Sequence, residues 1–244
     1  MSDVVYGEYL GLAALLDGPA DREVHDEQLF VTVHRVHELW FDLLLHDLTD
    51  ARDRMLAGET RVPLRRLARC AGVQRALLDT VGLLDTLPPQ EFLAFRGSLG
   101  TASGAQSAQF HELEVLAGRS DPRLPDRLTW LTPAERTRLE RRLAEPSLWD
   151  GFLAVLAKAG LDVSDPPARE AAYARLLRDP ELEPAADLAD ALHGYDQSWA
   201  AWRYRHSLVA ERQIGTRPGT GGSTGVQYLR QRADHRFFPE LTHR

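Results

Sequence analysis

The chain has 244 residues, of which 43% are hydrophobic, enough apolar material for the core of one large domain or two small ones, so disorder is excluded as its main state. Its 29 Lys and Arg against 36 Asp and Glu give a formal charge of −7, and the basic residues are dispersed, which makes nucleic acid a poor partner. The single cysteine, Cys70, excludes an internal disulfide and any metal site that needs several thiolates from one chain.

Apolar residues recur at spacings of three and four through the first half of the chain, as one face of a helix requires. The pattern predicts helices over residues 26–57, 63–87 and 107–118. Asp26 is expected to cap the first, Pro63 opens the second, and Pro88-Pro89 stops it. Gly118 is expected to be the C-terminal cap of the third.

The second half continues the helical pattern in shorter segments. Thr132-Pro133 followed by Glu135 marks a helix start, because threonine, a first-turn proline and a carboxylate at the third position form a capping arrangement. Further helices are expected over 148–159, 167–177 and 185–212. Strand signals are nearly absent. We therefore expect one all-α domain over residues 1–244, a bundle of long helices with a small inserted helical segment at about 119–181.

No segment of the sequence predicts membrane insertion or export. Asp3 and Glu8 stand where a signal peptide would carry basic residues before an apolar core. No apolar run reaches the roughly 18 residues that a membrane span needs. Together with the single cysteine, this predicts a soluble protein of the reducing cytoplasm.

A histidine and a glycine-rich loop stand close together near the C-terminus. His206 lies on the last long helix, between Trp202 and Val209, where an imidazole can bind a metal axially. The free amides and hydroxyls of the loop Gly219–Gly225 can close over a small polar ligand. Taken alone, a histidine in this position is more often a hydrogen-bonded core residue than a metal ligand.

Two further features could have either a functional or a purely structural role. His34 and His37 share one helical face and form an i,i+3 pair, but a metal site in a bundle wants carboxylates or Glu-x-x-His units on facing helices, which favours a structural role. Arg96 precedes a short polar segment, where a guanidinium can pair with a substrate carboxylate through two hydrogen bonds. A lone arginine more often forms a surface or structural salt bridge.

Three blocks of the sequence resemble the tryptophan 2,3-dioxygenase family in order and spacing. In chain order they are Tyr6-Gly7-Glu8-Tyr9-Leu10 with His25-Asp26-Glu27-Gln28-Leu29-Phe30, His34 and Glu38-Leu39-Trp40; Phe95-Arg96 with Leu99, Ala102-Ser103-Gly104, Gln106-Ser107 and Gln109-Phe110; and Trp202-Arg203-Tyr204-Arg205-His206 with Gly219-Thr220-Gly221-Gly222-Ser223. In that family a W-R-x-x-H segment supplies the heme iron ligand and a G-T-G-G-[ST] loop covers the substrate. The blocks bracket nearly the whole chain.

The resemblance implies a role for each matching residue. His206 is the axial ligand of a b-type heme that is ferrous in the active state, and His34 holds the indole N–H. Arg96 pairs with the substrate carboxylate, and Thr220 closes over the amino-acid end. The resemblance further implies that Phe30, Phe92 and Leu99 line the pocket, that Ser103 lies near the heme edge, and that Tyr6, Tyr9 and Leu10 reach a neighbouring subunit of a homotetramer. His37 has no functional counterpart and is expected to be structural or on the surface.

The activity that this resemblance implies is insertion of O2 across the indole C2–C3 bond of L-tryptophan, giving N-formylkynurenine, the first product of a kynurenine pathway. The alternative is a heme-dependent mono-oxygenase that makes an oxindole from a substituted tryptophan, such as β-methyltryptophan, in secondary metabolism. Ala105 favours that alternative, because most family members have phenylalanine there and a methyl group leaves room beside the pocket. Thr101 also departs from the family pattern.

Two other classes of function compete with an enzyme. One is a non-catalytic sensor of heme or of an amino acid, and the other is an all-α scaffold without a cofactor. The joint presence of Arg96, His34 and Thr220 argues against both, because a scaffold needs none of these residues.

Overall fold

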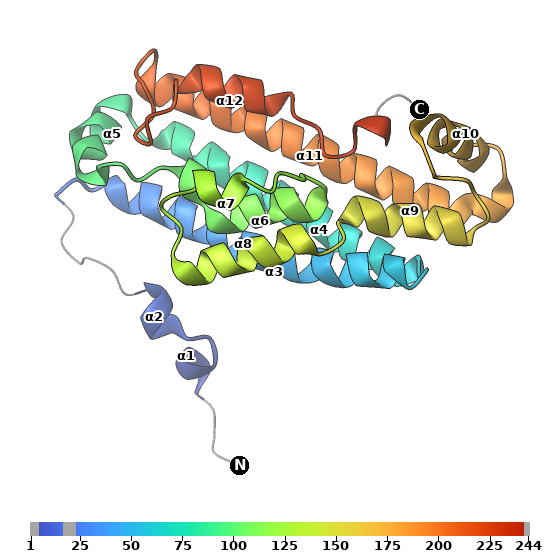
Figure 1. Ribbon diagram of the computed structural model, residues 1–244. Coiled ribbons are helices and arrows are strands. Elements are labelled where there is room, and N and C mark those ends of the chain that lie inside the picture. Colours follow the sequence, from blue (N-terminus) through green and yellow to red (C-terminus); the bar gives the residue numbers. More distant parts are fainter. Residues whose placement is uncertain (1–4, 17–22, 242–244) are drawn as a thin grey trace.

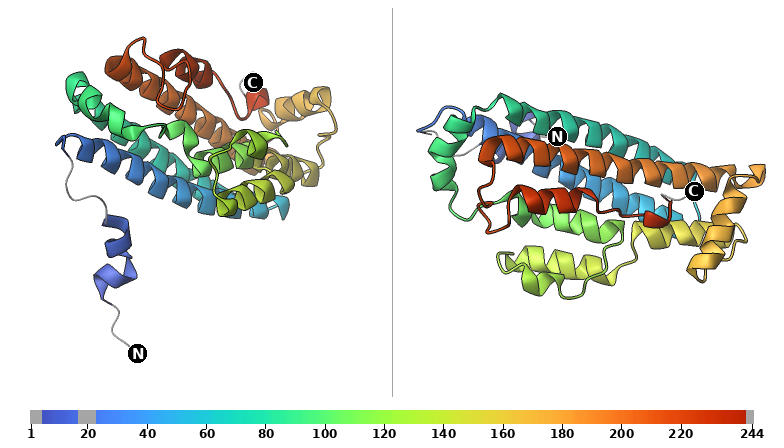
Figure 2. Two further views of the ribbon diagram at one scale, coloured as in Figure 1. Left: turned by 60° about the vertical axis from the view of Figure 1, so that its left-hand side comes forward. Right: turned by 90° about the horizontal axis from the view of Figure 1, so that it is seen from above.

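The computed structural model describes residues 5–16 and 23–241, and all regular secondary structure within these ranges is helical. Three long helices form the body of the molecule: α3 (Glu27–Leu56), α4 (Arg61–Gly82) and α11 (Glu183–Ile214). Helix α4 packs against both α3 and α11, and the three helices lie side by side (Figures 1 and 2). The expected all-α bundle of long helices is confirmed.

Apolar residues at helical spacing bury one face of each long helix, which holds the bundle together. The core residues of α3, α4 and α11 are Phe41, Leu44, Leu45, Leu48, Ala51, Met55, Leu67, Cys70, Val73, Leu77, Ala185, Leu188, Ala189, Leu192, Tyr195 and Trp199. Burial in this core raises the pKa of the Cys70 thiol to about 12, so the thiol is not a nucleophile at neutral pH.

The helix ends follow the sequence signals with two differences. Asp26 precedes α3, but its carboxylate accepts from His25 Nδ1 at 3.0 Å and makes no capping hydrogen bond, so the expected cap is wrong. Helix α4 starts at Arg61, two residues before Pro63, because the third position of a helix also tolerates a residue without an N–H. Its last turn tightens into the 3₁₀ segment η1 (Leu83–Thr86).

The segment after α4 turns back across one end of the bundle. It contains α5 (Pro89–Phe95), η2 (Arg96–Leu99) and η3 (Gly104–Gln106), and leads into α6 (Ala108–Ala117). The Ser107 hydroxyl caps α6 by accepting from the Phe110 N–H at 3.1 Å. Gly118 ends α6 with a φ of +131°, a conformation that L side chains rarely adopt, so its predicted role as a cap is confirmed.

The segment expected to be a small insertion is built from several short elements. They are α7 (Leu124–Arg127), α8 (Pro133–Ala144), α9 (Leu148–Lys158), α10 (Pro166–Leu176) and η4 (Pro180–Leu182). Helix α8 starts with the predicted capping box of Thr132 and Glu135 and packs on α6. Helix α9 packs on α3 and buries Leu148, Phe152 and Leu156 in the same core as the long helices. The second half of the segment therefore helps to build the main core.

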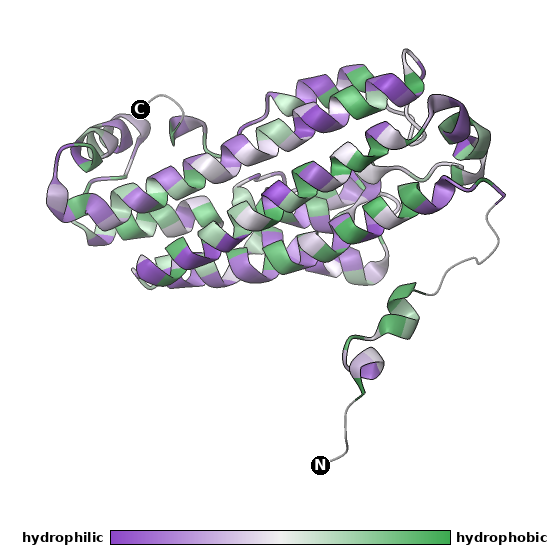
Figure 3. Cartoon of the chain, turned by 180° about the vertical axis from the view of Figure 1, so that it is seen from behind, coloured by the Kyte–Doolittle hydropathy of each residue, from purple (hydrophilic) through white to green (hydrophobic). Residues whose placement is uncertain are grey.

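Four short elements lie at the two ends of the described chain, and the last of them adds Leu241 to this core. At the C-terminal end, α12 (Val226–Ala233) packs along α11, and η5 (Pro239–Leu241) follows it. At the N-terminal end, α1 (Tyr6–Tyr9) and α2 (Leu12–Leu16) project away from the bundle (Figure 1), and they bury no residue. Figure 3 shows that α2 is strongly hydrophobic. Within the described ranges, no helix is long and apolar enough to cross a membrane.

Candidate active site

Two adjoining cavities lie between α3 and α11, under η3 and α12. The spaces between their walls are partly open to solvent and similar in size, about 940 Å³ for the first and about 910 Å³ for the second. Their shared lining residues are His34, Leu84, Gly104, Ala105, His206, Tyr228 and Leu229. The two spaces therefore form one continuous site with His34 and His206 at the junction.

His206 presents an imidazole to both cavities from α11. Neither of its ring nitrogens has a hydrogen-bond partner among the described residues, although its ring lies 5.4 Å from that of Trp202. Burial, with smaller contributions from His34 and His37, lowers the pKa of His206 to about 4. A neutral imidazole with a free nitrogen, held on a rigid helix inside a cavity, is the form in which histidine binds a metal.

The walls of the first cavity fit the heme that the sequence resemblance implies. Its apolar lining consists of Val33, Phe41, Val81, Leu84, Phe110, Trp202 and Leu229, which suits the flat face of a porphyrin. His206, which has no hydrogen-bond partner among the described residues, is the side chain in this apolar region that can bind iron. Arg203, Arg232 and Glu114 line another part of the wall. His206 would hold the iron and the apolar side chains would hold the ring.

His34 lies on α3 with its tautomer fixed by the backbone. Its Nδ1 lies 2.7 Å from the Phe30 carbonyl oxygen, which only accepts, so Nδ1 carries the proton and donates. Burial lowers the pKa of His34, which keeps the ring neutral and leaves Nε2 as an acceptor. The Phe30 and His34 ring centroids are 4.2 Å apart. His34 is therefore able to accept a hydrogen bond from an N–H group in the second cavity.

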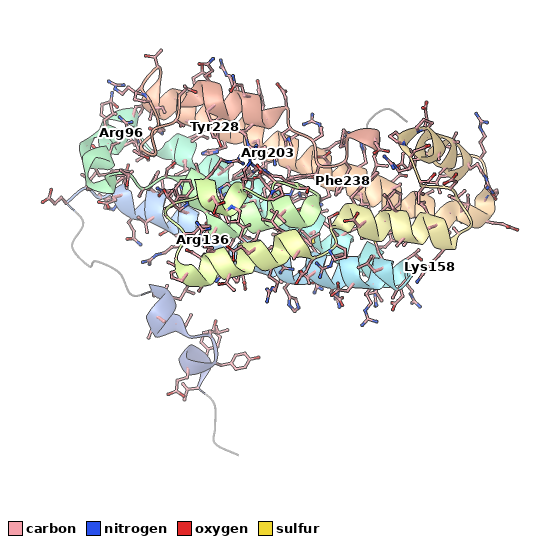
Figure 4. The ribbon with its side chains drawn as sticks, viewed as in Figure 1. Arg96, Arg136, Lys158, Arg203, Tyr228 and Phe238 are labelled. Atoms are coloured by element: carbon pink, nitrogen blue, oxygen red, sulfur yellow. The ribbon has the colours of Figure 1, made fainter. Side chains whose placement is uncertain are left out.

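The second cavity has an aromatic wall and a cationic end. Phe30 and Phe92 line it with their ring centroids 5.7 Å apart, and Leu99 lines it from η2. The Arg96 guanidinium at the same end donates to the Pro218 carbonyl, and its Nε is buried without a hydrogen-bond partner. Figure 4 labels Arg96 on η2 and Tyr228 on α12, two residues of this wall. This end fits the carboxylate of an amino acid.

The glycine-rich loop closes the second cavity. The Thr220 hydroxyl donates to the Ala102 carbonyl at 2.6 Å, which ties the loop to the segment before η3. A Cβ on Gly221 would lie 2.9 Å from Ser103 Cβ, so only glycine permits this approach. Ser103 itself caps η3 and lines the second cavity. The loop and Ser103 therefore lie against each other at the wall of the second cavity.

Ala105 lines both cavities at their junction. Its methyl group leaves space where a larger side chain would stand between them. The size of this side chain therefore bears on the shape of the ligand that the second cavity admits.

Three of the predicted site residues do not reach these cavities. Tyr6, Tyr9 and Leu10 lie on or beside α1 and are 74%, 79% and 45% exposed. None of them lines either cavity. The site within one chain is thus built without the N-terminal residues.

His37 was assigned no functional role from the sequence, yet it lines the first cavity and is only 7% exposed. Its Nδ1 donates to the Val33 carbonyl at 2.7 Å, and its Nε2 accepts from Trp202 Nε1 at 3.2 Å. Both nitrogens are occupied, which argues against a metal pair with His34. The spacing of three residues between the two histidines was the sequence signal for this position.

A buried ionic cluster forms another part of the cavity wall. Glu114 on α6 is fully buried and forms ion pairs with Arg119, Arg203 and Arg232, while His111 Nδ1 lies 3.4 Å away. Figure 4 labels Arg203, which comes from α11. Burial alone would raise the pKa of Glu114, but the neighbouring His111 and the charges of Arg232 and Arg119 outweigh it and lower the pKa to about 2.

We expect Glu114→Gln to lower the free energy of unfolding by about 3 kcal/mol at neutral pH, because it leaves buried arginines without their anion. The folded-state pKa is lowered from 4.5 to about 2, so the carboxylate contributes stability above pH 4.5 and loses it as the pH falls toward 2. Denaturant unfolding of heme-free parent and variant from neutral pH down to about pH 3.5 checks this. The difference in the free energy of unfolding between parent and variant should narrow below pH 4.5. A constant difference would contradict the lowered pKa assigned to Glu114.

Comparison with known proteins gives a consistent result. The sequence model of the tryptophan 2,3-dioxygenase family matches residues 1–150 and 171–243. A tryptophan 2,3-dioxygenase of Nocardioides sp. is 43% identical, over 98% of this chain and 93% of the relative. Those of Anaeromyxobacter sp. and Pseudomonas fluorescens are 39% and 37% identical, over 98% and 97% of this chain and 94% and 88% of the relatives. The chain belongs to the tryptophan 2,3-dioxygenase family.

Proposed function

We propose that this chain is a heme-dependent dioxygenase that adds both atoms of O2 across the indole C2–C3 bond of L-tryptophan and releases N-formylkynurenine. The observation that carries the proposal is the junction of the two cavities. There, His206, which has no hydrogen-bond partner among the described residues, faces a largely apolar cavity, and His34 stands beside the second cavity, which Arg96 also lines. Membership of the family adds support, because the relatives compared above are named tryptophan 2,3-dioxygenase.

Each residue of the second cavity has a task in this reaction. When bound through His206, ferrous heme supplies the binding and activation of O2. Arg96 pairs with the substrate carboxylate, and Thr220 closes the loop over the amino-acid end. His34 Nε2 accepts the indole N–H and so fixes the orientation of the ring in the pocket. These residues orient the substrate, and no proton transfer to His34 is needed.

The pocket walls keep water away from the reacting atoms. Phe30, Phe92 and Leu99 give the indole an apolar surface, and the Gly219–Gly225 loop with Ser103 covers the cavity. A closed, mostly apolar site suits a reaction in which both oxygen atoms must go to the indole ring.

We further infer that the active assembly is an oligomer, and a homotetramer in keeping with the family resemblance. The support is the exposure of Tyr6, Tyr9 and Leu10 on α1, together with the apolar surface of α2 (Figure 3). An apolar helix none of whose own residues is buried, as in α2, is typical of a contact with another chain. The N-terminal residues would then complete the pocket of a neighbouring subunit.

Dioxygenation is favoured over the mono-oxygenase alternative because the relatives reported above share the dioxygenase name. A titration of heme-free protein with hemin, followed by turnover of L-tryptophan under O2, tests the proposal. We expect one heme per chain, a Soret band typical of histidine ligation, and turnover. A red protein that turns over no indole would instead favour the sensor, and a folded protein that takes up no heme would favour the scaffold.

The role of His34 predicts how the enzyme treats a methylated substrate. Parent protein should turn over N1-methyltryptophan with a kcat/KM at least about 10-fold below that for L-tryptophan, because the methyl group removes the hydrogen bond to His34 Nε2. His34→Ala should keep its heme and lose this discrimination. Steady-state kinetics of both proteins on both substrates provide the measurement. Equal activity of the parent on the two substrates would refute the assigned role.

A further inference from the structure

His37 and Trp202 connect two helices across the first cavity. His37 lies on α3 and Trp202 on α11, and the Trp202 indole N–H donates to His37 Nε2 at 3.2 Å. The other ring nitrogen of His37 donates to the Val33 carbonyl one turn earlier on α3. With both nitrogens bonded and only 7% of its surface exposed, the His37 ring has one orientation. It is therefore a fixed acceptor for the indole N–H.

Trp202 transmits this constraint to His206. The two residues are four positions apart on α11 and so share one face of the helix. Their ring centroids are 5.4 Å apart with an interplanar angle of 35°, so the indole forms the wall beside the imidazole. His206 has no hydrogen-bond partner of its own among the described residues, which leaves neighbouring rings to limit its rotation. Among the described aromatic residues, Trp202 is the one whose ring contacts it.

Trp199 supplies an internal comparison. It belongs to the same aromatic cluster, 5.4 Å from Trp202 between ring centroids, and is only 1% exposed. Its indole N–H is buried beside the Tyr195 side chain and makes no hydrogen bond to His37. Of these two neighbouring indoles, only Trp202, the one beside His206, donates to His37.

We infer that His37 is a positioning residue for the proposed heme ligand: through its hydrogen bond to Trp202 it fixes the indole wall that sets the orientation of the His206 ring. This inference rests on the proposed heme site. Without the acceptor, the Trp202 N–H would be left unbonded in an apolar wall, and the indole would gain freedom to turn. His206 would then meet iron at a less defined angle.

Four single variants of the heme-loaded full chain test this role. His37→Leu removes the acceptor, and His37→Gln keeps an acceptor at about the distance of Nε2. Trp202→Phe removes the donor but keeps a ring, and Trp199→Phe is the matched control, because it removes an indole N–H of the same cluster that is not bonded to His37. The readouts are the iron–histidine stretching vibration of the ferrous protein by resonance Raman spectroscopy and the rate of heme transfer to apomyoglobin.

We expect His37→Leu and Trp202→Phe to shift the vibration in the same direction and to speed heme loss about tenfold, the effect of losing one buried hydrogen bond. The double variant should be no worse than the stronger single variant, since both remove the same bond. His37→Gln and Trp199→Phe should stay close to the parent.

The inference is overturned if His37→Leu leaves the vibration unchanged, if its effect adds to that of Trp202→Phe, or if His37→Gln behaves like His37→Leu. Should His37→Leu fail to fold, equal behaviour of Trp202→Phe and Trp199→Phe overturns it instead. A parent protein without a histidine-ligated heme spectrum would overturn the proposed function and this inference together. A normal parent with unaffected variants would overturn this inference alone.

Discussion

His206→Ala is expected to abolish stable heme binding, with the affinity falling on the order of 100-fold or more. The His206 imidazole lies at the junction of the two cavities and has no hydrogen-bond partner among the described residues. Its lowered pKa keeps it neutral and able to bind iron at neutral pH. The surrounding apolar wall would still attract a porphyrin, but without a bond to the metal. Titration of heme-free variant and parent with hemin, followed at the Soret band, measures the difference.

A matched control and a rescue make this test specific. His193 lies on the same helix, is hydrogen-bonded to Gln197 and lines none of the cavities of the site, so His193→Ala should bind heme like the parent. Free imidazole is small enough to enter the space that His206→Ala creates, and it should restore a histidine-like spectrum. Full heme occupancy of His206→Ala with an unchanged spectrum would refute the ligand assignment.

Arg96→Ala should raise the KM for L-tryptophan about 100-fold while heme binding stays intact. The Arg96 guanidinium is the cationic group that lines the second cavity together with Phe92 and Leu99. Its Nε is buried without a hydrogen-bond partner among the described residues. Loss of a charged, two-point contact with a carboxylate costs on the order of 3 kcal/mol in a desolvated pocket. Steady-state kinetics, with the heme content of each preparation recorded, give the value.

Tryptamine, which lacks the carboxylate, identifies the contact that is lost. Parent protein should strongly prefer L-tryptophan to tryptamine, and Arg96→Ala should treat the two almost alike. Arg65→Ala on the exposed face of α4 is the control, because this residue lines none of the cavities and should leave both values unchanged. If Arg96→Ala keeps the parent's preference for L-tryptophan, Arg96 does not bind the carboxylate.

The fold was predictable because the decisive signals are local. Apolar spacing set the extents of α3 and α11 to within about two residues, and the capping residues Ser107, Gly118 and Thr132 stand where the helices begin or end. The predicted cap at Asp26 was wrong because its carboxylate is hydrogen-bonded to His25, which competes with the backbone for the same oxygen. The contribution of α9 to the main core was not foreseen, since periodicity shows that a helix has an apolar face but not which helix covers it.

The site was predictable only in part, for a different reason. Motif resemblance pointed to Arg96, Thr220 and His206, and these residues do line one continuous space although they are far apart in sequence. The place of His37 in the cavity wall was not predicted because its partner, Trp202, is 165 positions away, and no local pattern indicates such a contact. The ionic cluster around Glu114 was not predicted either, since its arginines come from three different parts of the chain.

The most direct test of the central claim is the mass of the product formed from L-tryptophan by the ferrous, heme-loaded protein under isotopically labelled O2, with β-methyltryptophan run in parallel. We expect a product that has gained two labelled oxygen atoms from L-tryptophan and has the fragmentation pattern of N-formylkynurenine. Gain of a single oxygen, above all on the β-methylated substrate alone, would contradict dioxygenation. It would assign the same cavity and residues to a mono-oxygenase.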